Sequence, residues 1–207
     1  MSGRLITLEG GEGAGKSTAV AVVKAWLEAR GRQVVLTREP GGTAAAEKIR
    51  AVLLDPATGE LQPLTELLLM FAARAENLAA VIRPALERDM DVICDRFTDA
   101  SMAYQGGGRE LGREPVERLA GLVHPDISPD LTLLLDVPVD VGMSRVGSRG
   151  DAPDRFEQAR ADFLERVRAS YLDQADREPE RFAVIDASQT LDQVQAAIIR
   201  VLEQRLS

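Results

Sequence analysis

A glycine-rich segment near the start of the chain carries the residue types that bind phosphate. It lies between an apolar run and a helical pattern, fits G-x-x-x-x-G-K-[S/T], and reads Gly10-Gly11-Glu12-Gly13-Ala14-Gly15-Lys16-Ser17. Glycines let backbone N–H groups turn inward around a phosphate at the positive end of a helix. Lys16 is therefore expected to reach the β- and γ-phosphates of a nucleotide, and the Ser17 hydroxyl to bind Mg²⁺. A Rossmann dinucleotide site is excluded, because Lys16 stands where its third glycine is required.

One residue of this loop, Glu12, is expected to serve a different ligand. A carboxylate beside bound phosphates is electrostatically unfavourable, so direct contact with them is not its expected role. We expect Glu12 to accept a hydrogen bond from a hydroxyl group of a second substrate. The alternative is a side chain that faces solvent.

Asp95 and Arg96 follow the third apolar run, at the carboxyl end of an expected strand. Ligands of open α/β folds bind at that edge of the sheet. Asp95 could hold Mg²⁺ through water, and Arg96 could hold a phosphate. The alternative for such an adjacent pair is a surface salt bridge.

Arg74 interrupts an apolar helical stripe, whose members at steps of three and four residues are Leu67, Phe71, Arg74, Leu78 and Ile82. A buried guanidinium needs a carboxylate or a ligand as its partner. Met70 and Phe71 lie one turn before Arg74 and could stack on a base, which suggests a nucleoside monophosphate as a substrate. In the alternative, both residues belong to the core and Arg74 pairs with an internal acid.

Two further arginines could extend a phosphate site. Arg38 lies in the stretch from Thr37 to Thr43, and Arg50 lies in the helix that this stretch opens. Each of them, taken alone, is better explained as a solvated side chain.

Short apolar runs alternate with helical patterns along the chain. Strands are expected at residues 5–8, 33–37, 91–94, 131–135 and 182–185, and helices at 16–30, 43–54, 63–88, 113–123, 138–147, 156–177 and 190–205. Such alternation predicts an α/β fold with a parallel sheet and helices on both faces. Gly106 to Arg109 is interpreted as a flexible connecting turn, and the loop from Gly147 to Pro153, which bears Arg149, as a functional loop.

The charge composition limits the partners of the chain. Its 207 residues include 25 basic and 33 acidic side chains, a net charge of −8, and the basic set is 22 Arg and 3 Lys. This argues against nucleic acid or an anionic membrane as a partner, since both need a broad basic face. A single Cys and a single His exclude an internal disulfide and the common zinc sites. With no apolar run near ~20 residues and no signal-peptide pattern, we expect a cytoplasmic protein.

Together these motifs resemble the thymidylate kinases. The matching segments are residues 8–18, 37–43, 95–105, 154–157 and 166–168, which span nearly the whole chain. The resemblance implies a P-loop NTPase fold, a three-layer sandwich with five parallel strands in the order 2-3-1-4-5. It implies one nucleoside monophosphate kinase domain over residues 1–207, with a lid at about 147–155. It also implies transfer of the γ-phosphoryl group of MgATP to dTMP, giving dTDP and ADP for dTTP synthesis, in a cytoplasmic homodimer.

The resemblance assigns roles to individual residues. Lys16, Arg96 and Arg149 would be catalytic, and Ser17 and Asp95, the latter through water, would hold Mg²⁺. ATP would contact the loop from Gly10 to Thr18 and also Arg145. The residues that would contact dTMP are Glu12, Arg38, Arg50, Met70, Phe71, Arg74, Arg96, Ser101 and Gln105. Within this set, Glu12 would meet the 3′-hydroxyl group, Arg50 and Arg96 the phosphate, and Arg74, Ser101 and Gln105 the thymine edge.

Two departures from the family pattern affect the base site. Met70 occupies the position of the usual stacking Phe, four residues before Arg74, while Phe71 lies three before it. Both offsets face the same side of a helix, so either residue could stack on the base. Ala100 replaces the first Ser of the family pattern, which leaves the hydroxyl role to Ser101.

Two more departures affect the lid. Gly13 stands where some members carry an Arg in the phosphate loop, and members without that Arg supply the charge from the lid, where Arg149 is the matching residue. This indicates the lid-arginine subtype of bacterial members. The lid has one insertion between Arg149 and Arg155, so either of these arginines could reach the phosphates.

The main alternative function is a P-loop kinase of another nucleotide or a small metabolite, although a non-nucleotide acceptor would not need an aromatic side chain beside a base-reading Arg. A GTP-binding switch is excluded, because it needs an Asn-Lys-x-Asp motif and the single Asn, Asn77, precedes Leu78. The intact Lys16, Ser17 and Asp95 argue against a silent interaction module.

Overall fold

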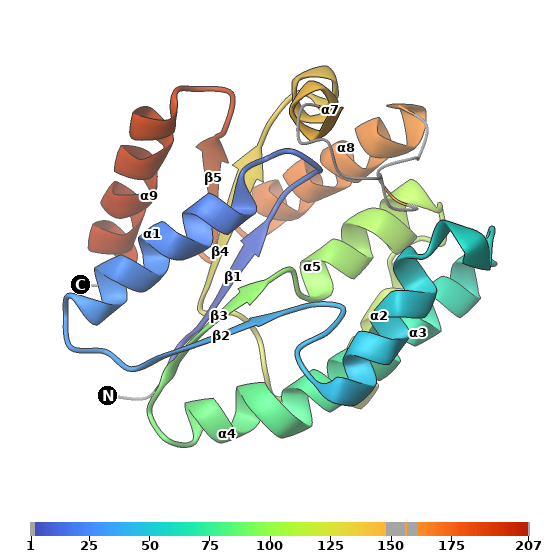
Figure 1. Ribbon diagram of the computed structural model, residues 1–207, viewed down its shortest axis with the longest axis horizontal. Coiled ribbons are helices and arrows are strands. Elements are labelled where there is room, and N and C mark those ends of the chain that lie inside the picture. Colours follow the sequence, from blue (N-terminus) through green and yellow to red (C-terminus); the bar gives the residue numbers. More distant parts are fainter. Residues whose placement is uncertain (1–2, 148–155, 157–160, 207) are drawn as a thin grey trace.

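Five parallel strands form one sheet in the computed structural model, which describes residues 3–147, 156 and 161–206. The strands are β1 (Leu5–Glu9), β2 (Val34–Arg38), β3 (Asp91–Asp95), β4 (Leu131–Asp136) and β5 (Phe182–Asp186). Their order is β2-β3-β1-β4-β5 (Figure 1), which confirms the order implied by the family resemblance.

Helices cover both faces of this sheet (Figure 1). One face carries α1 (Lys16–Glu28) and α9 (Leu191–Leu206). The other carries the run of α3 (Pro63–Asn77), the π-helical η2 (Leu78–Ile82) and α4 (Arg83–Leu86), together with α5 (Thr98–Ser101), the π-helical η3 (Met102–Gly108) and α8 (Ala161–Arg177). The remaining described helices are α2 (Ala44–Leu54), the 3₁₀ turn η1 (Pro56–Thr58), α6 (Glu114–Val123) and α7 (Val139–Gly147). Within the described ranges, every helix is too short or too polar to cross a bilayer.

Both faces of β1 are buried, which explains its unbroken apolar run. Ile6 and Leu8 pack with residues of α1 and α9, whereas Leu5 packs with residues of η2 and α4. Two-sided burial is typical of a parallel sheet between helical layers. It also encloses the polar Glu9 at the carboxyl end of β1, which is fully buried and must find hydrogen-bond partners.

The segment with three consecutive glycines forms part of η3, so its interpretation as a flexible connecting turn is wrong. This helix packs tightly on α8. A Cβ atom at Gly108 would lie 2.6 Å from the Phe163 ring and 2.8 Å from Val167, too close for any side chain. The glycines therefore allow η3 and α8 to approach each other closely.

The carboxyl ends of the central strands meet at one edge. Leu8 of β1 is in register with Asp95 of β3, and Glu9 with Leu134 of β4. The phosphate loop that follows β1 therefore lies next to the Asp95-Arg96 pair that follows β3, as expected for ligand sites of parallel sheets.

Candidate active site

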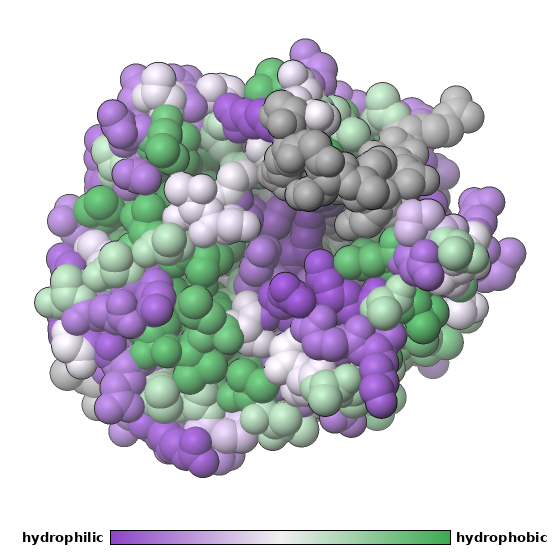
Figure 2. Space-filling model, in the orientation of Figure 1, coloured by the Kyte–Doolittle hydropathy of each residue, from purple (hydrophilic) through white to green (hydrophobic). Residues whose placement is uncertain are grey.

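A cleft at this edge has about 610 Å³ of empty space, part of which is open to solvent. Figure 2 shows hydrophilic side chains gathered in a hollow near the centre of the face that it presents. The cleft is lined from the phosphate loop, the loop after β2, α2, α3 and the helical segment after β3. Its lining residues are Glu12, Glu39, Pro40, Arg50, Leu54, Met70, Arg74, Arg96, Phe97, Ala100, Ser101, Tyr104, Gln105 and Phe156.

Arg74 is almost fully buried in the wall of this cleft, with 2% of its surface exposed. Its Nε donates to Glu39 Oε2 at 2.6 Å, and its Nη2 donates to the Phe97 carbonyl oxygen and to Ser101 Oγ, both at 3.0 Å. Among the described residues, its Nη1 has no hydrogen-bond partner. Arg74 thus pairs with an internal acid, as one interpretation predicts, and retains one buried donor; its contact with a ligand stays a prediction.

Glu39 holds Arg74 in place and is held in turn by its neighbours. Its side chain is buried, and its Oε1 accepts a hydrogen bond from Asn77 Nδ2 at 3.3 Å. Burial raises the pKa of Glu39, while the Arg74 guanidinium and the Asn77 amide oppose that rise. An acid fixed on two sides leaves the Arg74 guanidinium little freedom to turn.

Met70 lines the cleft, whereas Phe71 does not. The Phe71 ring lies parallel to His124, with 6.4 Å between ring centroids, and beneath the Arg74 guanidinium, whose central carbon is 4.4 Å from the ring centroid. Phe71 is therefore a core residue that supports Arg74 from behind. The prediction that it contacts the ligand is not supported, because its side chain is buried and does not line the cleft.

A second buried acid, Glu66 of α3, lies behind the cleft. It is fully buried, and its Oε1 accepts a hydrogen bond from Gln105 Nε2 at 2.8 Å. Arg109 forms an ion pair with it, with 3.2 Å between Nη2 and Oε2. The side chain of Gln105 is thereby fixed at the cleft wall, one helical turn beyond Ser101.

Arg96 lies at the junction of the cleft with the phosphate loop. Its Nη2 donates to Glu12 Oε1 at 2.9 Å, and its Nη1 donates to the Tyr171 hydroxyl at 3.2 Å. The Tyr104 hydroxyl donates to the same oxygen of Glu12 at 2.7 Å. The backbone of Arg96 has φ +70°, a conformation that non-glycine residues adopt only where their surroundings impose it.

Glu9 fixes the backbone next to Arg96. Its Oε1 accepts from the Phe97 N–H at 2.7 Å, and its Oε2 accepts from the Tyr171 hydroxyl at 2.7 Å. Burial, together with the nearby Asp99, raises the pKa of Glu9 from 4.5 to about 8 against the opposing effect of Arg96. Tyr171 thus bridges this buried acid and the Arg96 guanidinium.

The phosphate loop has the geometry of an anion cradle. The Lys16 ammonium donates to the carbonyl oxygens of Gly10 and Gly11, both at 3.1 Å. Desolvation and the nearby Arg96 lower the pKa of Lys16. Beside it, Asp95 Oδ1 is buried and has no hydrogen-bond partner within the described part of the chain. This free carboxylate oxygen fits a role in holding a hydrated Mg²⁺ ion.

Gly13 is where the loop touches α7. Its φ is +69°, and a Cβ atom there would collide with the carbonyl group of Gly142, while a Cβ atom at Gly142 would collide with the Glu12 carbonyl oxygen. The backbone of α7 therefore lies directly against the phosphate loop. This contact leaves no room for a side chain at position 13.

A second cavity of about 490 Å³ lies beyond the loop, between α1, α7 and the start of α9. Arg145 of α7 borders it and donates to the carbonyl oxygens of Ala187 at 2.9 Å and Gly13 at 3.4 Å. The other residues that line it are Ala14, Gly15, Thr18, Ala19, Val22, Ala187, Gln189, Leu191, Val194, Gln195 and Ile198. The cavity therefore adjoins the part of the loop where the nucleotide donor is expected.

The two remaining arginines of the predicted phosphate site differ. Arg50 lines the cleft and donates to the Pro40 carbonyl oxygen at 2.8 Å. Arg38 lies outside it, because its half-exposed guanidinium pairs with Glu47 at 3.0 Å. The prediction that Arg38 contacts the ligand is therefore not supported, and its solvated alternative holds. Arg149 and Arg155 lie outside the described residues.

Comparison with known proteins agrees with this geometry. The family model described as thymidylate kinase matches residues 8–198. A thymidylate kinase of Chromohalobacter salexigens is 59% identical and covers 99% of this chain and 97% of its own. One of Pseudomonas syringae pv. syringae is 53% identical over 100% of this chain and 98% of its own. The crystal structure of thymidylate kinase from Ehrlichia chaffeensis is 35% identical, has a TM-score of 0.79, and covers 98% of this chain and 99% of its own. The chain belongs to the thymidylate kinase family.

Within this family member, sequence analysis missed the residues that hold the others in place. These are Glu39, Glu66, Tyr104 and Tyr171, none of which was assigned to the site. One signal was available for Glu66: it lies next to Leu67 of the buried stripe, so an acid at that place needs a partner. Tyr171 gives no such signal, because a tyrosine in an amphipathic helix is ordinarily a core residue.

Proposed function

We propose that this chain transfers the γ-phosphoryl group of ATP to dTMP, giving dTDP and ADP, in line with its family. The observation that carries the proposal is the buried Arg74 Nη1, which lacks a hydrogen-bond partner among the described residues at the wall of the cleft. A buried donor requires an acceptor, and the exocyclic O4 of thymine is one. Met70, the lining residue one turn earlier, would contact the face of the base through its thioether.

The acceptor nucleotide would lie between the arginines and Glu12. Arg50 and Arg96 would hold its phosphate, since both line the cleft and a guanidinium is a fixed fork for phosphate oxygens. Glu12 would accept a hydrogen bond from the 3′-hydroxyl group. Its contacts with Arg96 and Tyr104 support this role, because they hold the carboxylate at the junction of the two substrates.

The donor would bind on the phosphate loop. Backbone N–H groups from Gly10 to Thr18, together with Lys16, would surround the β- and γ-phosphates. Arg145 would border the adenine in the second cavity. Ser17 and Asp95, the latter through water, would hold Mg²⁺, which when bound neutralises charge on the β- and γ-phosphates.

Catalysis would rest on position and charge. A phosphate monoester is largely ionised near pH 7, so the dTMP oxygen needs no strong base to attack. Lys16 and Arg96 would gather the negative charge of the two nucleotides as the phosphoryl group moves in line. Arg149 of the lid, at about 147–155 in the one kinase domain, would add a third positive charge.

ADP release from MgATP with a panel of nucleoside monophosphates tests this function. The assay uses the full 22.4 kDa chain and equal concentrations of each nucleotide. We expect activity with dTMP and little with AMP, GMP or CMP. A preference for another nucleotide, or for a small phosphorylated or hydroxylated metabolite, would replace dTMP by the alternative P-loop kinase function.

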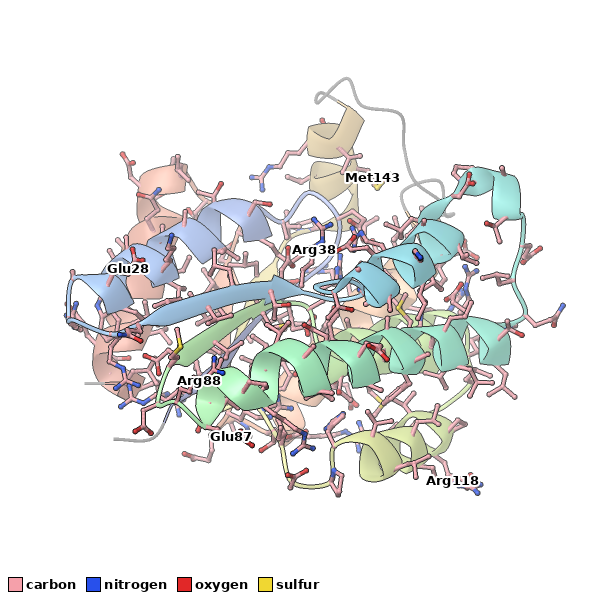
Figure 3. The ribbon with its side chains drawn as sticks, turned by 60° about the horizontal axis from the view of Figure 1, so that its bottom comes forward. Glu28, Arg38, Glu87, Arg88, Arg118 and Met143 are labelled. Carbon is pink, nitrogen blue, oxygen red and sulfur yellow. The ribbon has the colours of Figure 1, made fainter. Side chains whose placement is uncertain are left out.

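We also propose that the enzyme works as a homodimer in the cytoplasm. Helices α3 and α6 lie side by side (Figure 3), and they expose Leu64, Leu68 and Leu122 by 52%, 49% and 77%. Exposed apolar residues grouped on two helices fit a surface covered by a second copy.

Leu68→Glu should yield a monomer in sedimentation equilibrium, whereas Ile199→Glu on α9 should not; a monomeric wild-type protein would contradict the proposal.

A further inference from the structure

Glu66 is a buried acid that reaches the ligand site only through another side chain. It does not line the cleft, yet its Oε1 is 2.8 Å from Gln105 Nε2, and Gln105 does line it. Glu66 also forms an ion pair with Arg109, with 3.2 Å between Nη2 and Oε2. A carboxylate only accepts hydrogen bonds, so it selects the end of the Gln105 amide that donates.

This contact determines which end of Gln105 faces the cleft. The oxygen and nitrogen of an amide have nearly the same shape, and an unconstrained glutamine can present either one. With Nε2 held on Glu66, Oε1 is the end left for a ligand in the cleft. Position 105 therefore presents an acceptor.

Arg74 presents the opposite polarity beside it. Glu39 holds its Nε, Ser101 and Phe97 hold its Nη2, and Nη1 remains as a donor. Ser101 accepts a hydrogen bond from Arg74 and lies one helical turn before Gln105. Arg74 and Gln105 are therefore neighbours on one wall of the cleft. The wall thus carries a donor next to an acceptor.

That pair is complementary to thymine and opposed to cytosine. Thymine and uracil present an acceptor, O4, beside a donor, N3–H. Cytosine presents a donor, its 4-amino group, beside an acceptor, N3. Building on the proposed dTMP kinase function, we propose that Glu66 is a positioning residue that sets discrimination between thymine and cytosine, by holding the Gln105 carbonyl toward the base.

The size of the effect follows from the buried mismatch. A site built to hydrogen-bond one pattern rejects the other strongly, because its polar groups are left unpaired. Cytosine makes two mismatches with this wall: its 4-amino group faces the Arg74 donor, and its N3 faces the Gln105 acceptor. Loss of the Glu66 contact lets Gln105 turn and removes the second mismatch, whereas the first remains. We expect that relaxation to be about tenfold, since one hydrogen bond to a buried group contributes about 1 to 1.5 kcal/mol.

The test compares dTMP with 5-methyl-2′-deoxycytidine monophosphate, which keeps the 5-methyl group and differs in the hydrogen-bonding edge. Both nucleotides compete in one reaction, and the product ratio gives the ratio of kcat/KM values. In Glu66→Gln, the new amide can donate to or accept from Gln105, and the preference for dTMP should fall about tenfold. Because the two substrates share one enzyme preparation, partial unfolding of the variant does not alter the ratio.

Arg109→Gln is the matched control. It removes the ion pair between Arg109 and Glu66 and leaves the Gln105 contact in place. The preference should therefore stay within about twofold of wild type, equivalent to about 0.4 kcal/mol. In Gln105→Met, the preference should already be reduced, and adding Glu66→Gln should lower it no further.

An unchanged preference in Glu66→Gln, with both nucleotides slowed equally, would overturn the inference and leave Glu66 a structural residue. An equal loss of preference in Arg109→Gln would also overturn it, because the ion pair would then be responsible. Failure of the wild-type enzyme to phosphorylate dTMP would instead contradict the proposed function itself.

Discussion

The two sides of the active-site region differ in the kind of atom that meets the ligand. On the donor side, the phosphate loop offers backbone groups, and Lys16 is held by the carbonyl oxygens of Gly10 and Gly11. On the acceptor side, the wall consists of side chains, each fixed by an acid: Arg74 by Glu39, Gln105 by Glu66, and Arg96 by Glu12.

The difference means that the donor side can bind any nucleoside triphosphate, whereas the acceptor side can select one base. A backbone cradle at a helix N-terminus fits any nucleoside triphosphate, because it contacts only phosphates. Side chains with fixed donors and acceptors distinguish one base from another. Even a paired buried acid is often less favourable for folding than an apolar side chain, so selection is obtained at the expense of folding stability.

The largest expected effect concerns Arg149, which lies outside the described residues and which the family resemblance assigns to a lid. Arg149→Ala should lower kcat by about 10³ with little change in dTMP affinity, as for other arginines that neutralise a migrating phosphoryl group. Because that charge does not depend on the base, every accepted nucleotide should be slowed by the same factor. Steady-state kinetics with dTMP and dUMP measure this; an unchanged kcat would remove Arg149 from the mechanism.

Arg74 tests the acceptor side. Arg74→Lys keeps a positive charge against Glu39 but removes the forked second donor, so KM for dTMP should rise about 30-fold, the effect of about 2 kcal/mol for a hydrogen bond to a charged group. KM for ATP should stay within about twofold. Similar rises for both substrates would mean that Arg74 supports the whole domain rather than the base site.

Substitutions at Met70 and Phe71 test whether the first residue contacts the base and the second belongs to the core. Met70→Ala should raise KM for dTMP about fivefold, from loss of a thioether contact of about 1 kcal/mol with the base. Phe71→Leu should instead reduce the free energy of unfolding by about 1 to 2 kcal/mol with KM nearly unchanged. Denaturant titration and kinetics on both variants measure the two effects, and an exchange of their phenotypes would reassign the stacking surface to Phe71.

Glu9 lies between the two sides, and its expected effect is on stability rather than on catalysis, as a dependence of the free energy of unfolding on pH. The folded protein keeps its proton to about pH 8, whereas the unfolded chain loses it near 4.5. Between these values the folded state binds more protons, so this residue lowers the free energy of unfolding as pH rises, by at most about 1.4 kcal/mol per unit. Glu9→Gln should remove that contribution in urea titrations from pH 5 to 8; parallel curves for both proteins would contradict it.

Local patterns predicted most of the fold and the donor side. The phosphate loop is set by contiguous residues, and the helical period placed Arg74 on a buried face, as its 2% exposure confirms. The partners that fix the wall were not predictable in this way. Glu39 is 35 residues from Arg74, and Glu66 is 39 from Gln105, so only the folded arrangement joins them.

The other differences between expectation and structure have the same origin. Arg38 ends β2 at the ligand edge, and its half-exposed guanidinium pairs with Glu47 of α2. The helical period left open whether Met70 or Phe71 faces the ligand; in the fold Met70 lines the cleft, and the Phe71 ring lies parallel to His124. Three glycines in sequence suggested a turn, whereas contact with Phe163 and Val167 of α8 requires them.

The contact of Gly13 with Gly142 makes an arginine in the phosphate loop hard to acquire in evolution. Family members that carry an arginine in the loop need a side chain at position 13, and here the carbonyl group of Gly142 occupies that space. A single substitution at position 13 would displace α7, the helix that leads to the segment bearing Arg149. In this chain, an arginine at position 13 would therefore have to be preceded by a change in the position of α7.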